Sequence, residues 1–362
     1  MSRFFSSKYQ NLKAYTPGEQ PRGMRYIKLN TNESPYPPSE SVRAAVAEES
    51  GRLALYSDPE CTDLIATAAA RFGVEPDEIL MSNGSDEILN FAFMAFSDAA
   101  HPVVFPDITY GFYPVFAQLS GIPYETIPLM PDFSIRISDY MGIGRNIVIA
   151  NPNAPTGLAL PVSDIEKIVS SNPGNVVVID EAYVDFGAES TVPLIRKYPN
   201  LLVTGTFSKS RSMAGARLGF GIGDRALIRD LKTMQYSTNP YNVNRMTAAA
   251  GKAALLDDGY YMENCRKIER TREKTKQELE SLGFHVTNSK ANFLFAGSDR
   301  IGGEELYLEL KQRGILVRHF DGERIRNYNR ITIGTPEQMA AFLAAVKEIL
   351  AERKAEVYDE TK

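Results

Sequence analysis

Short runs of β-branched and other apolar residues alternate with longer stretches of helical period between about residue 45 and residue 235. Such runs are typical of strands buried on both faces, and their alternation with helices predicts a largely parallel sheet covered by helices. The fold class indicated is therefore α/β. The expected strands include 101–105, 146–150, 176–180 and 201–206, and the expected helices include 86–96 and 162–170.

The remaining parts of the chain differ in pattern. A length of 362 residues suggests two domains. The first 40 residues carry five prolines and no regular period, which indicates an extended arm. After Asn239-Pro240 a long helical region runs to about 280, and strands at 291–296, 314–318 and 330–333 precede a closing helix from Pro336. We therefore expect an arm over 1–45, a large domain over 46–238 and a smaller α+β domain over 239–362.

Composition narrows the range of partners. The formal net charge of −5 gives no field that would gather nucleic acid or anionic lipid, so small-molecule chemistry is the better expectation. No stretch approaches the roughly 20 apolar residues that span a bilayer. Cys61 and Cys265 are far apart, and the first residues lack the apolar core of a secretory signal. We therefore expect a cytoplasmic protein without nucleic-acid or membrane partners.

Lys209 ends the motif Thr206-Phe207-Ser208-Lys209, which directly follows an expected strand. A lysine at a buried strand end is desolvated, which lowers its pKa and frees the amine to attack an aldehyde. Thr206, Ser208 and Arg217 could bind a phosphate nearby. An isolated Ser-Lys dipeptide is more often part of a solvated loop, so this motif needs support from others.

Asp180 follows four apolar residues and is expected at the carboxyl end of a central strand, where ligands of open α/β sheets bind. A buried aspartate needs a cation, and a protonated pyridine nitrogen would serve, keeping the ring an electron sink. Tyr183, three residues later, could donate to a phenolic oxygen on that ring. Strand-ending aspartates also bind Mg²⁺ or cap helices.

Three further motifs are weaker when taken singly. Ser82-Asn83-Gly84-Ser85-Asp86-Glu87 opens an apolar helix whose free amides could cradle a phosphate, although an ordinary helix cap has the same letters. The turn 151–157 follows a strand and can reach the same sheet edge. Tyr110 could stack on a planar ring, although aromatic residues after a strand more often belong to a core.

Together, in this order and spacing, the five motifs resemble the fold type I transferases that depend on pyridoxal 5′-phosphate. Several segments are similar to those of histidinol-phosphate aminotransferases. These segments are Leu-Asn-Thr-Asn-Glu-Ser-Pro at 29–35, Ser-Asn-Gly-Ser-Asp-Glu at 82–87, Asp-Glu-Ala-Tyr-Val-Asp-Phe at 180–186, Pro-Tyr-Asn-Val-Asn at 240–244 and Arg-Ile-Thr-Ile-Gly at 330–334. The similarity covers nearly the whole chain.

The resemblance implies roles for individual residues. Lys209 would hold the cofactor as an aldimine, Asp180 would pair with its ring nitrogen, and Tyr183 would bond its ring oxygen. Tyr110 would stack on the ring. The phosphate would be held by Gly84, Ser85, Asp86, Thr206, Ser208 and Arg217, joined by Tyr56 from the partner subunit. That last role implies a homodimer, with the arm packing on the small domain and on the partner.

The resemblance also places residues at the substrate. Arg330 matches an arginine that grips the α-carboxylate in a bidentate pair. Arg318, Tyr15 and Asn32 match positions near the substrate, and an arginine there suits a phosphate. One position departs from the family, because Ala154 stands where an asparagine usually bonds the ring oxygen. Either Asn153 replaces that bond through a shifted turn, or Tyr183 supplies it alone.

The implied reaction is a ping-pong transamination of L-histidinol phosphate with 2-oxoglutarate, giving imidazole-acetol phosphate and glutamate in histidine biosynthesis. An aromatic-amino-acid aminotransferase and a threonine-phosphate decarboxylase on the same fold are the alternatives, and a non-catalytic binding module is a third. Retention of both Lys209 and Asp180 argues against the last. His101, His285 and His319 lack metal-ligand spacing, so we expect no metal site.

Overall fold

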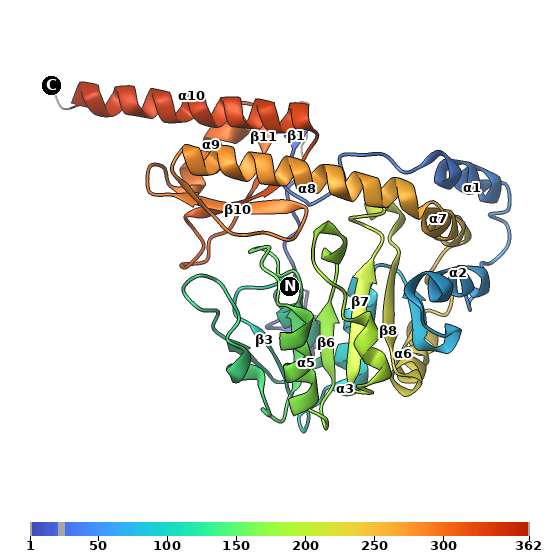
Figure 1. The fold of residues 1–362 in the computed structure, drawn as a ribbon. Coiled ribbons are helices and arrows are strands. Elements are labelled where there is room, and N and C mark those ends of the chain that lie inside the picture. Colours follow the sequence, from blue (N-terminus) through green and yellow to red (C-terminus); the bar gives the residue numbers. More distant parts are fainter. Residues whose placement is uncertain (1, 21–25, 361–362) are drawn as a thin grey trace.

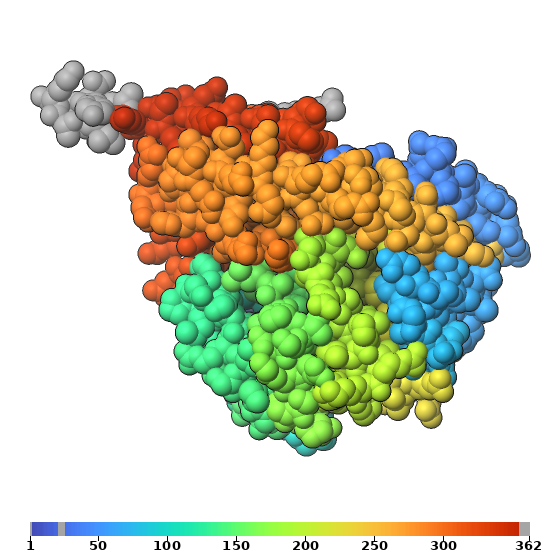
Figure 2. All heavy atoms as spheres, viewed as in Figure 1, coloured from blue at the N-terminus to red at the C-terminus, as the bar shows by residue number. Residues whose placement is uncertain are grey.

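The computed structural model describes residues 2–20 and 26–360 of the chain. Figure 1 shows a large body built on a seven-stranded sheet, with a smaller body above it that carries a four-stranded sheet. The space-filling view shows the orange and red residues of the smaller body resting directly on the green residues of the larger one (Figure 2). The α/β architecture expected from the sequence is confirmed.

The large sheet has the strand order β2-β8-β7-β6-β5-β3-β4. All neighbouring pairs are parallel except those that β8 makes with β2 and β7. In that order the strands are β2 (Ile79–Ser82), β8 (Gly219–Gly223), β7 (Leu201–Thr206), β6 (Val177–Asp180), β5 (Asn146–Ala150), β3 (Val103–Pro106) and β4 (Tyr124–Ile127). The register pairs Asp180 with Ala150 on one side and with Thr204 on the other, so three strands end at one edge.

Helices cover both faces of this sheet, with α5 on the face turned to the viewer and α3 behind it (Figure 1). The helices of the large body are α1 (Glu40–Ser50), α2 (Thr62–Phe72), α3 (Ser85–Phe96), α4 (Tyr113–Ser120), α5 (Val162–Ser171), α6 (Arg225–Thr238) and α7 (Arg245–Leu256). Alternate residues of each central strand enter two cores. In β7, Leu201 and Val203 face one core and Leu202 the other. This two-sided burial explains the continuous apolar runs.

β8 carries glycine at every second position, so only Phe220 and Ile222 contribute large apolar side chains to it. A Cβ atom at Gly219 would lie 2.2 Å from the backbone nitrogen of Ser85, and one at Gly221 would lie 2.9 Å from Ile88. These glycines allow α3 to approach the sheet more closely than a side chain would permit. The start of α3 is thereby brought beside the strand ends.

The smaller body is an antiparallel sheet in the order β12-β13-β10-β9, packed against helices. Its strands are β9 (Phe284–Val286), β10 (Phe293–Ser298), β12 (Arg318–His319) and β13 (Tyr328–Thr332), and its helices are α8 (Asp258–Ser281), α9 (Gly303–Gln312) and α10 (Pro336–Glu360). The arm joins this body, since β1 (Ile27–Lys28) pairs in parallel with β11 (Ile315–Leu316).

Helix α8 belongs to both bodies and crosses their boundary in Figure 1. Its Tyr261 lies in the core of the large body, whereas Ile268 and Leu279 lie in the core of the small one. The preceding helix α7 contributes Ala250 and Ala254 to the large core. The boundary expected after residue 238 thus falls before two elements that continue the packing of the large body.

Six short 3₁₀ helices complete the described chain. They are η1 (Ser7–Tyr9), η2 (Pro76–Glu78), η3 (Ile137–Tyr140), η4 (Val184–Phe186), η5 (Val192–Arg196) and η6 (Ala214–Ala216). None of the helices within residues 2–20 and 26–360 is both long and apolar enough to cross a membrane.

Candidate active site

Two joined cavities lie where the strand ends of the large sheet meet the arm and the small sheet. The inner cavity has a volume of about 160 Å³ and is lined by Ser85, Asp86, Tyr110, Ala150, Ala154, Asp180, Ala182, Tyr183, Thr206, Ser208, Lys209 and Arg217. The outer cavity, of about 760 Å³, shares four of these residues, Tyr110, Ala154, Tyr183 and Lys209, and adds Tyr15, Asn32, Arg318 and Arg330. The structure therefore brings most of the sequence-predicted residues together.

Lys209 stands between the two cavities, directly after β7. Its Nζ donates a hydrogen bond to the Thr31 carbonyl at 3.3 Å and lies 5.9 Å from the centre of the Tyr183 ring. Burial, assisted by the positive charge of Arg330, lowers the pKa of the lysine amine to about 8. About a tenth of the amine is therefore neutral, and nucleophilic, at pH 7, far more than for a lysine of ordinary pKa.

Asp180 ends β6 in the wall of the inner cavity. Its Oδ2 accepts a hydrogen bond from the Tyr113 hydroxyl at 3.0 Å, and its Oδ1 accepts from Thr204 Oγ1 at 3.2 Å and from the Ala182 nitrogen at 3.3 Å. Burial raises the pKa of this carboxyl to about 6, while the hydrogen bonds oppose the rise. A cation placed beside it would hold it ionised.

Tyr113 has a position in this site that the sequence analysis did not assign. It is fully buried at the start of α4, three residues after Tyr110, and its ring meets the Tyr110 ring edge-on at 5.6 Å. The sequence offered no local signal for this role, because Tyr110 precedes α4 and the contact of Tyr113 with Asp180 depends on how α4 packs against the strand end.

An anion cradle lies at the start of α3. Gly84 has a φ of +79°, which glycine adopts without strain, and its missing side chain leaves room for Arg217. Arg217 Nη2 lies 3.1 Å from Asp86 Oδ2, and Tyr110 donates to Asp86 Oδ1 at 2.8 Å. Thr206 Oγ1 lies 2.9 Å from Ser208 Oγ. Hydroxyls, a guanidinium and the free amides of a helix start together suit a phosphate.

Asn32 links the arm to both bodies beside Tyr183. It has a left-handed φ of 57°, and its Nδ2 donates to the Tyr183 hydroxyl at 2.9 Å. Its backbone nitrogen donates to Thr332 Oγ1 at 2.9 Å, and its carbonyl accepts from Asn292 Nδ2 at 2.9 Å. The arm residue thus fixes the position of the Tyr183 hydroxyl relative to the small sheet.

Asn153, expected at the cofactor, lines neither cavity. Its Nδ2 donates to the Ile108 carbonyl at 3.0 Å and to Thr156 Oγ1 at 3.1 Å, and its Oδ1 accepts from Thr109 Oγ1 at 2.8 Å. The amide therefore fixes the turn to the segment after β3, because every polar atom already has a partner there. Ala154 faces both cavities without a polar group. Tyr183, the other residue predicted to make the ring-oxygen bond, lines both cavities.

Tyr56 also lies outside both cavities. Its ring is 80% exposed and stacks on Tyr241 at 4.6 Å on the surface of the chain. Its predicted contact with the cofactor of a partner subunit stays a prediction.

The outer cavity contains two arginines whose charges are not neutralised. Arg330 Nη2 donates to the Asn30 carbonyl at 3.0 Å, and its buried Nε has no partner among residues 2–20 and 26–360. Arg318 makes only long contacts with the Thr16 and Pro17 carbonyls, at 3.4 and 3.5 Å. Within the described part of the chain, no carboxylate lies within ion-pair distance of either guanidinium. The cavity therefore suits an anionic substrate.

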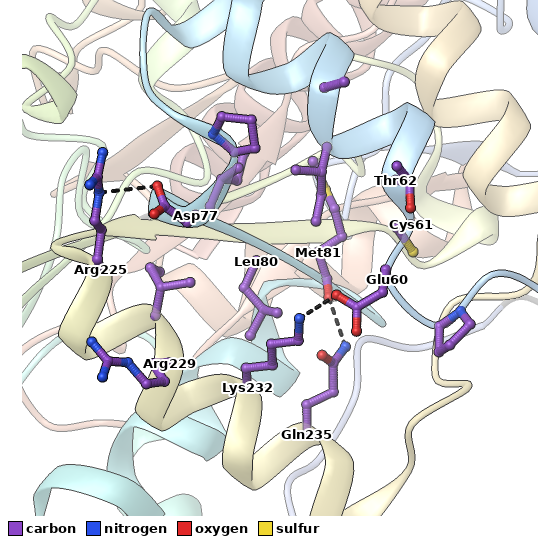
Figure 3. Close-up of a pocket in the computed structure, with 16 residues that line it drawn as sticks. Glu60, Cys61, Thr62, Asp77, Leu80, Met81, Arg225, Arg229, Lys232 and Gln235 are labelled. Atoms are coloured by element: carbon purple, nitrogen blue, oxygen red, sulfur yellow. Dashed lines mark hydrogen bonds and ion pairs between the residues drawn. The ribbon is translucent and has the colours of Figure 1, made fainter.

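Another hollow, on the far side of β2, is unlike this site (Figure 3). It is lined by residues of α2, β2 and α6, and its charges largely pair within the wall, Arg225 with Asp77 and Lys232 with Glu60. Burial raises the pKa of the Cys61 thiol to about 11, so the thiol is a poor nucleophile near neutral pH. The presence of this hollow alone therefore does not make it a reaction site.

The sequence model of the aminotransferases of class I and II matches residues 25–346. The match spans the second half of the arm, the large body, all residues of the inner cavity and most of the small body. The chain therefore belongs to the aminotransferase family of class I and II.

Within that family the chain is similar to histidinol-phosphate aminotransferases, as its motifs indicated. The one from Brachyspira hyodysenteriae is 49% identical over 352 residues, which cover 97% of this chain and 99% of that protein. The solved structure of histidinol-phosphate aminotransferase from Sinorhizobium meliloti, in complex with pyridoxal 5′-phosphate, has a TM-score of 0.87 at 23% identity and covers 97% of this chain and 99% of that chain.

The fold alone does not separate activities. L-threonine-O-3-phosphate decarboxylase from Porphyromonas gingivalis has a TM-score of 0.80 at 21% identity and covers 90% of this chain and 99% of that chain. The assignment to histidinol-phosphate aminotransferases therefore depends on the full-length sequence similarity.

Proposed function

We propose that this enzyme transfers the amino group of L-histidinol phosphate to 2-oxoglutarate, giving imidazole-acetol phosphate and glutamate in histidine biosynthesis. The observation that carries the proposal is the placement of Lys209, with its lowered pKa, between a buried carboxylate and two unneutralised arginines. The near full-length similarity to histidinol-phosphate aminotransferases supports the choice of substrate.

Pyridoxal 5′-phosphate is the cofactor, and the residues of the inner cavity fit it. Asp180, a buried carboxylate without a counter-cation among the described side chains, would hold the proton on the ring nitrogen. The cradle at the start of α3, with Thr206, Ser208 and Arg217, would hold the phosphate. Tyr110 would face the ring, and Tyr183 would donate to the ring oxygen. When bound, the cofactor supplies an aldehyde for Lys209 and an electron-withdrawing ring.

The protein groups then divide the work of the reaction. With the cofactor bound, Lys209 would be the amine that joins its aldehyde, and after displacement by the substrate's amine Nζ would be free to take the proton from the substrate Cα. Asp180 would keep the ring nitrogen protonated, so that the ring remains an electron sink. Arg330 binds the α-carboxylate of glutamate or 2-oxoglutarate. Histidinol phosphate has no carboxylate, so its phosphate uses Arg318 and Arg330.

We further infer that the enzyme works as a homodimer in the cytoplasm. Several large apolar side chains are exposed near one another, namely Leu53, Leu55, Tyr56 and Tyr241, and Tyr56 stacks on Tyr241. Such exposed apolar surface favours burial against a second copy of the chain. Tyr56 would then approach the partner's anion cradle. Light scattering should give the mass of two chains, and Tyr56→Ala should weaken cofactor binding without altering that mass.

The decisive experiment is to incubate the purified holoenzyme separately with glutamate and with histidinol phosphate and to follow the cofactor absorbance. Each substrate alone should convert the cofactor to its amine form, because each half of a ping-pong reaction proceeds without the other substrate. Phenylalanine and threonine phosphate serve as the competing donors. Preference for phenylalanine, or release of CO₂ from threonine phosphate without conversion of the cofactor, would reject the proposed substrate.

A further inference from the structure

The two arginines of the outer cavity stand directly opposite each other across the small sheet. Arg318 on β12 pairs with Arg330 on β13 in an antiparallel register. Residues opposite one another in such a pair project from the same face, and like charges in that position destabilise a sheet. The mutual repulsion contributes to the lowered pKa of Arg330, after its burial. Some other contact must therefore support this pair.

An aromatic ring is positioned to provide that support. Phe320 follows Arg318 by two residues and comes directly after the end of β12. The guanidinium carbon of Arg318 lies 5.6 Å from the centre of the Phe320 ring, and that of Arg330 lies 5.7 Å from it. Arg330 also lies 5.4 Å from the centre of the Phe293 ring. The guanidinium groups of both arginines thus lie over the Phe320 ring.

A ring supports a cation differently from a carboxylate. The negative face of the ring attracts the charge but leaves the N–H donors free and the net charge intact. Arg324, in the wall of the same cavity, shows the alternative. It pairs with Asp107 at 3.0 Å and donates to the carbonyls of Leu129 and Met130, so its charge and its donors are already used. Arg318 and Arg330 keep theirs for a ligand.

We infer that Phe320 is a positioning residue of the substrate site, which holds Arg318 and Arg330 as an unneutralised pair for a dianionic group. The inference rests on the proposed function, in which the ligand is a phosphate monoester that carries a charge of nearly −2 at neutral pH. Glutamate carries its negative charges on two separate carboxylates, and its α-carboxylate needs only one bidentate guanidinium. Phe320 therefore favours the phosphate substrate over glutamate.

The test compares Phe320→Leu and Phe320→Met, which remove the ring, with Phe320→Tyr, which keeps it. In the holoenzyme, the first two should raise the KM for histidinol phosphate about tenfold while changing kcat less than about twofold. The KM for glutamate should rise no more than about threefold. Phe320→Tyr should stay within about twofold of the wild type for both substrates.

Phe133→Leu is the matched control. Phe133 belongs to the same aromatic cluster and meets the rings of Phe295 and Tyr328 edge-on at 5.6 and 5.2 Å, but none of the described arginines has its guanidinium over this ring. Its replacement removes a ring of the same size from the same cluster. It should lower the thermal midpoint by an amount similar to Phe320→Leu and leave the KM ratio of the two substrates unchanged.

A binding measurement separates this inference from the proposed substrate. Inorganic phosphate should inhibit the glutamate half-reaction of the holoenzyme, and Phe320→Leu should raise its inhibition constant about tenfold. If the wild type ignored histidinol phosphate but this effect remained, the substrate assignment would fall and the role of Phe320 would stand. The positioning role of Phe320 would be overturned if Phe320→Leu and Phe133→Leu raised the inhibition constant of phosphate equally. It would also be overturned if Phe320→Tyr did not keep the inhibition constant of the wild type.

Discussion

The inner and outer cavities handle charge in opposite ways. In the inner cavity, Arg217 is paired with Asp86, and Asp180 accepts three hydrogen bonds from protein donors. In the outer cavity, Arg318 and Arg330 face each other with carbonyls and rings as their neighbours. The inner wall is thus stable before its ligand binds, whereas the outer wall keeps charge available. This difference suits a resident cofactor on one side and exchanging substrates on the other.

Replacing Lys209 should have the largest effect, because it removes the group that stands between the cavities. Lys209→Ala should lower turnover by more than about 10³-fold and abolish covalent trapping of the cofactor by borohydride. Lys209→Arg keeps a positive charge but offers no comparable nucleophile, and it should fail in the same way. Mass spectrometry of the reduced peptide is the measurement, and an adduct in either variant would show that another group binds the aldehyde.

Asp180→Asn tests the electrostatic part of the inner cavity. The amide cannot balance a protonated ring nitrogen, so kcat should fall by about 10²–10³-fold. The neighbouring Glu181 provides a matched control, since it is equally buried but accepts hydrogen bonds only from Ser190 and Thr191. Glu181→Gln should lower the thermal midpoint and leave kcat within a few-fold. Similar kcat losses in both variants would remove the special role of Asp180.

Arg330→Lys tests the outer cavity, since a lysine keeps the charge but loses the bidentate geometry. The KM values for glutamate and histidinol phosphate should each rise about 10- to 50-fold, with a smaller change in kcat. Arg324→Lys is the control from the same wall, because its charge is already balanced by Asp107. If steady-state kinetics gave the same KM increase for both variants, the contrast between paired and unpaired arginines would fail.

The pH dependence of cofactor attachment should sharpen the comparison between the two cavities. The neutral amine of Lys209 is the reactive form, and its pKa is about 8. Attachment to the apo-protein should therefore accelerate about tenfold per pH unit below 8 and level off above it. Arg330→Ala should move the midpoint upward, because it removes a positive charge that lowers this pKa. A rate that stayed flat from pH 6.5 to 9 would contradict the assigned pKa.

The sequence predicted the inner cavity better than the outer one, for a physical reason. Asp180 directly follows an apolar run, and Lys209 lies three residues after the end of β7, so their placement at one sheet edge depends mainly on local strand formation and parallel pairing. The hydrogen bond from Tyr113 to Asp180 depends on the packing of α4 against that edge, which no local pattern encodes.

Two other features depended on contacts that were not readable from the chain. Asn153 was expected at the cofactor, but the fold of the turn directs its amide to Ile108, Thr109 and Thr156. The opposition of Arg318 and Arg330 requires the register of β12 with β13, which joins residues twelve positions apart across a loop. The resemblance to a family suggested that both arginines lie at the substrate site. Only the strand register shows that their like charges stand opposite each other.

Helix α8 gives the two bodies a common structural element of 24 residues, with one end in each core. A chain divided after Thr238 would leave the first fragment without Ala250, Ala254 and Tyr261, which fill its interior, and the second with those apolar side chains facing water. Neither fragment would be a self-sufficient folding unit. Attempts to exchange the small body between relatives should therefore avoid junctions within α7 or α8. The core residues that these two helices contact in both bodies should come from the same relative as the helices.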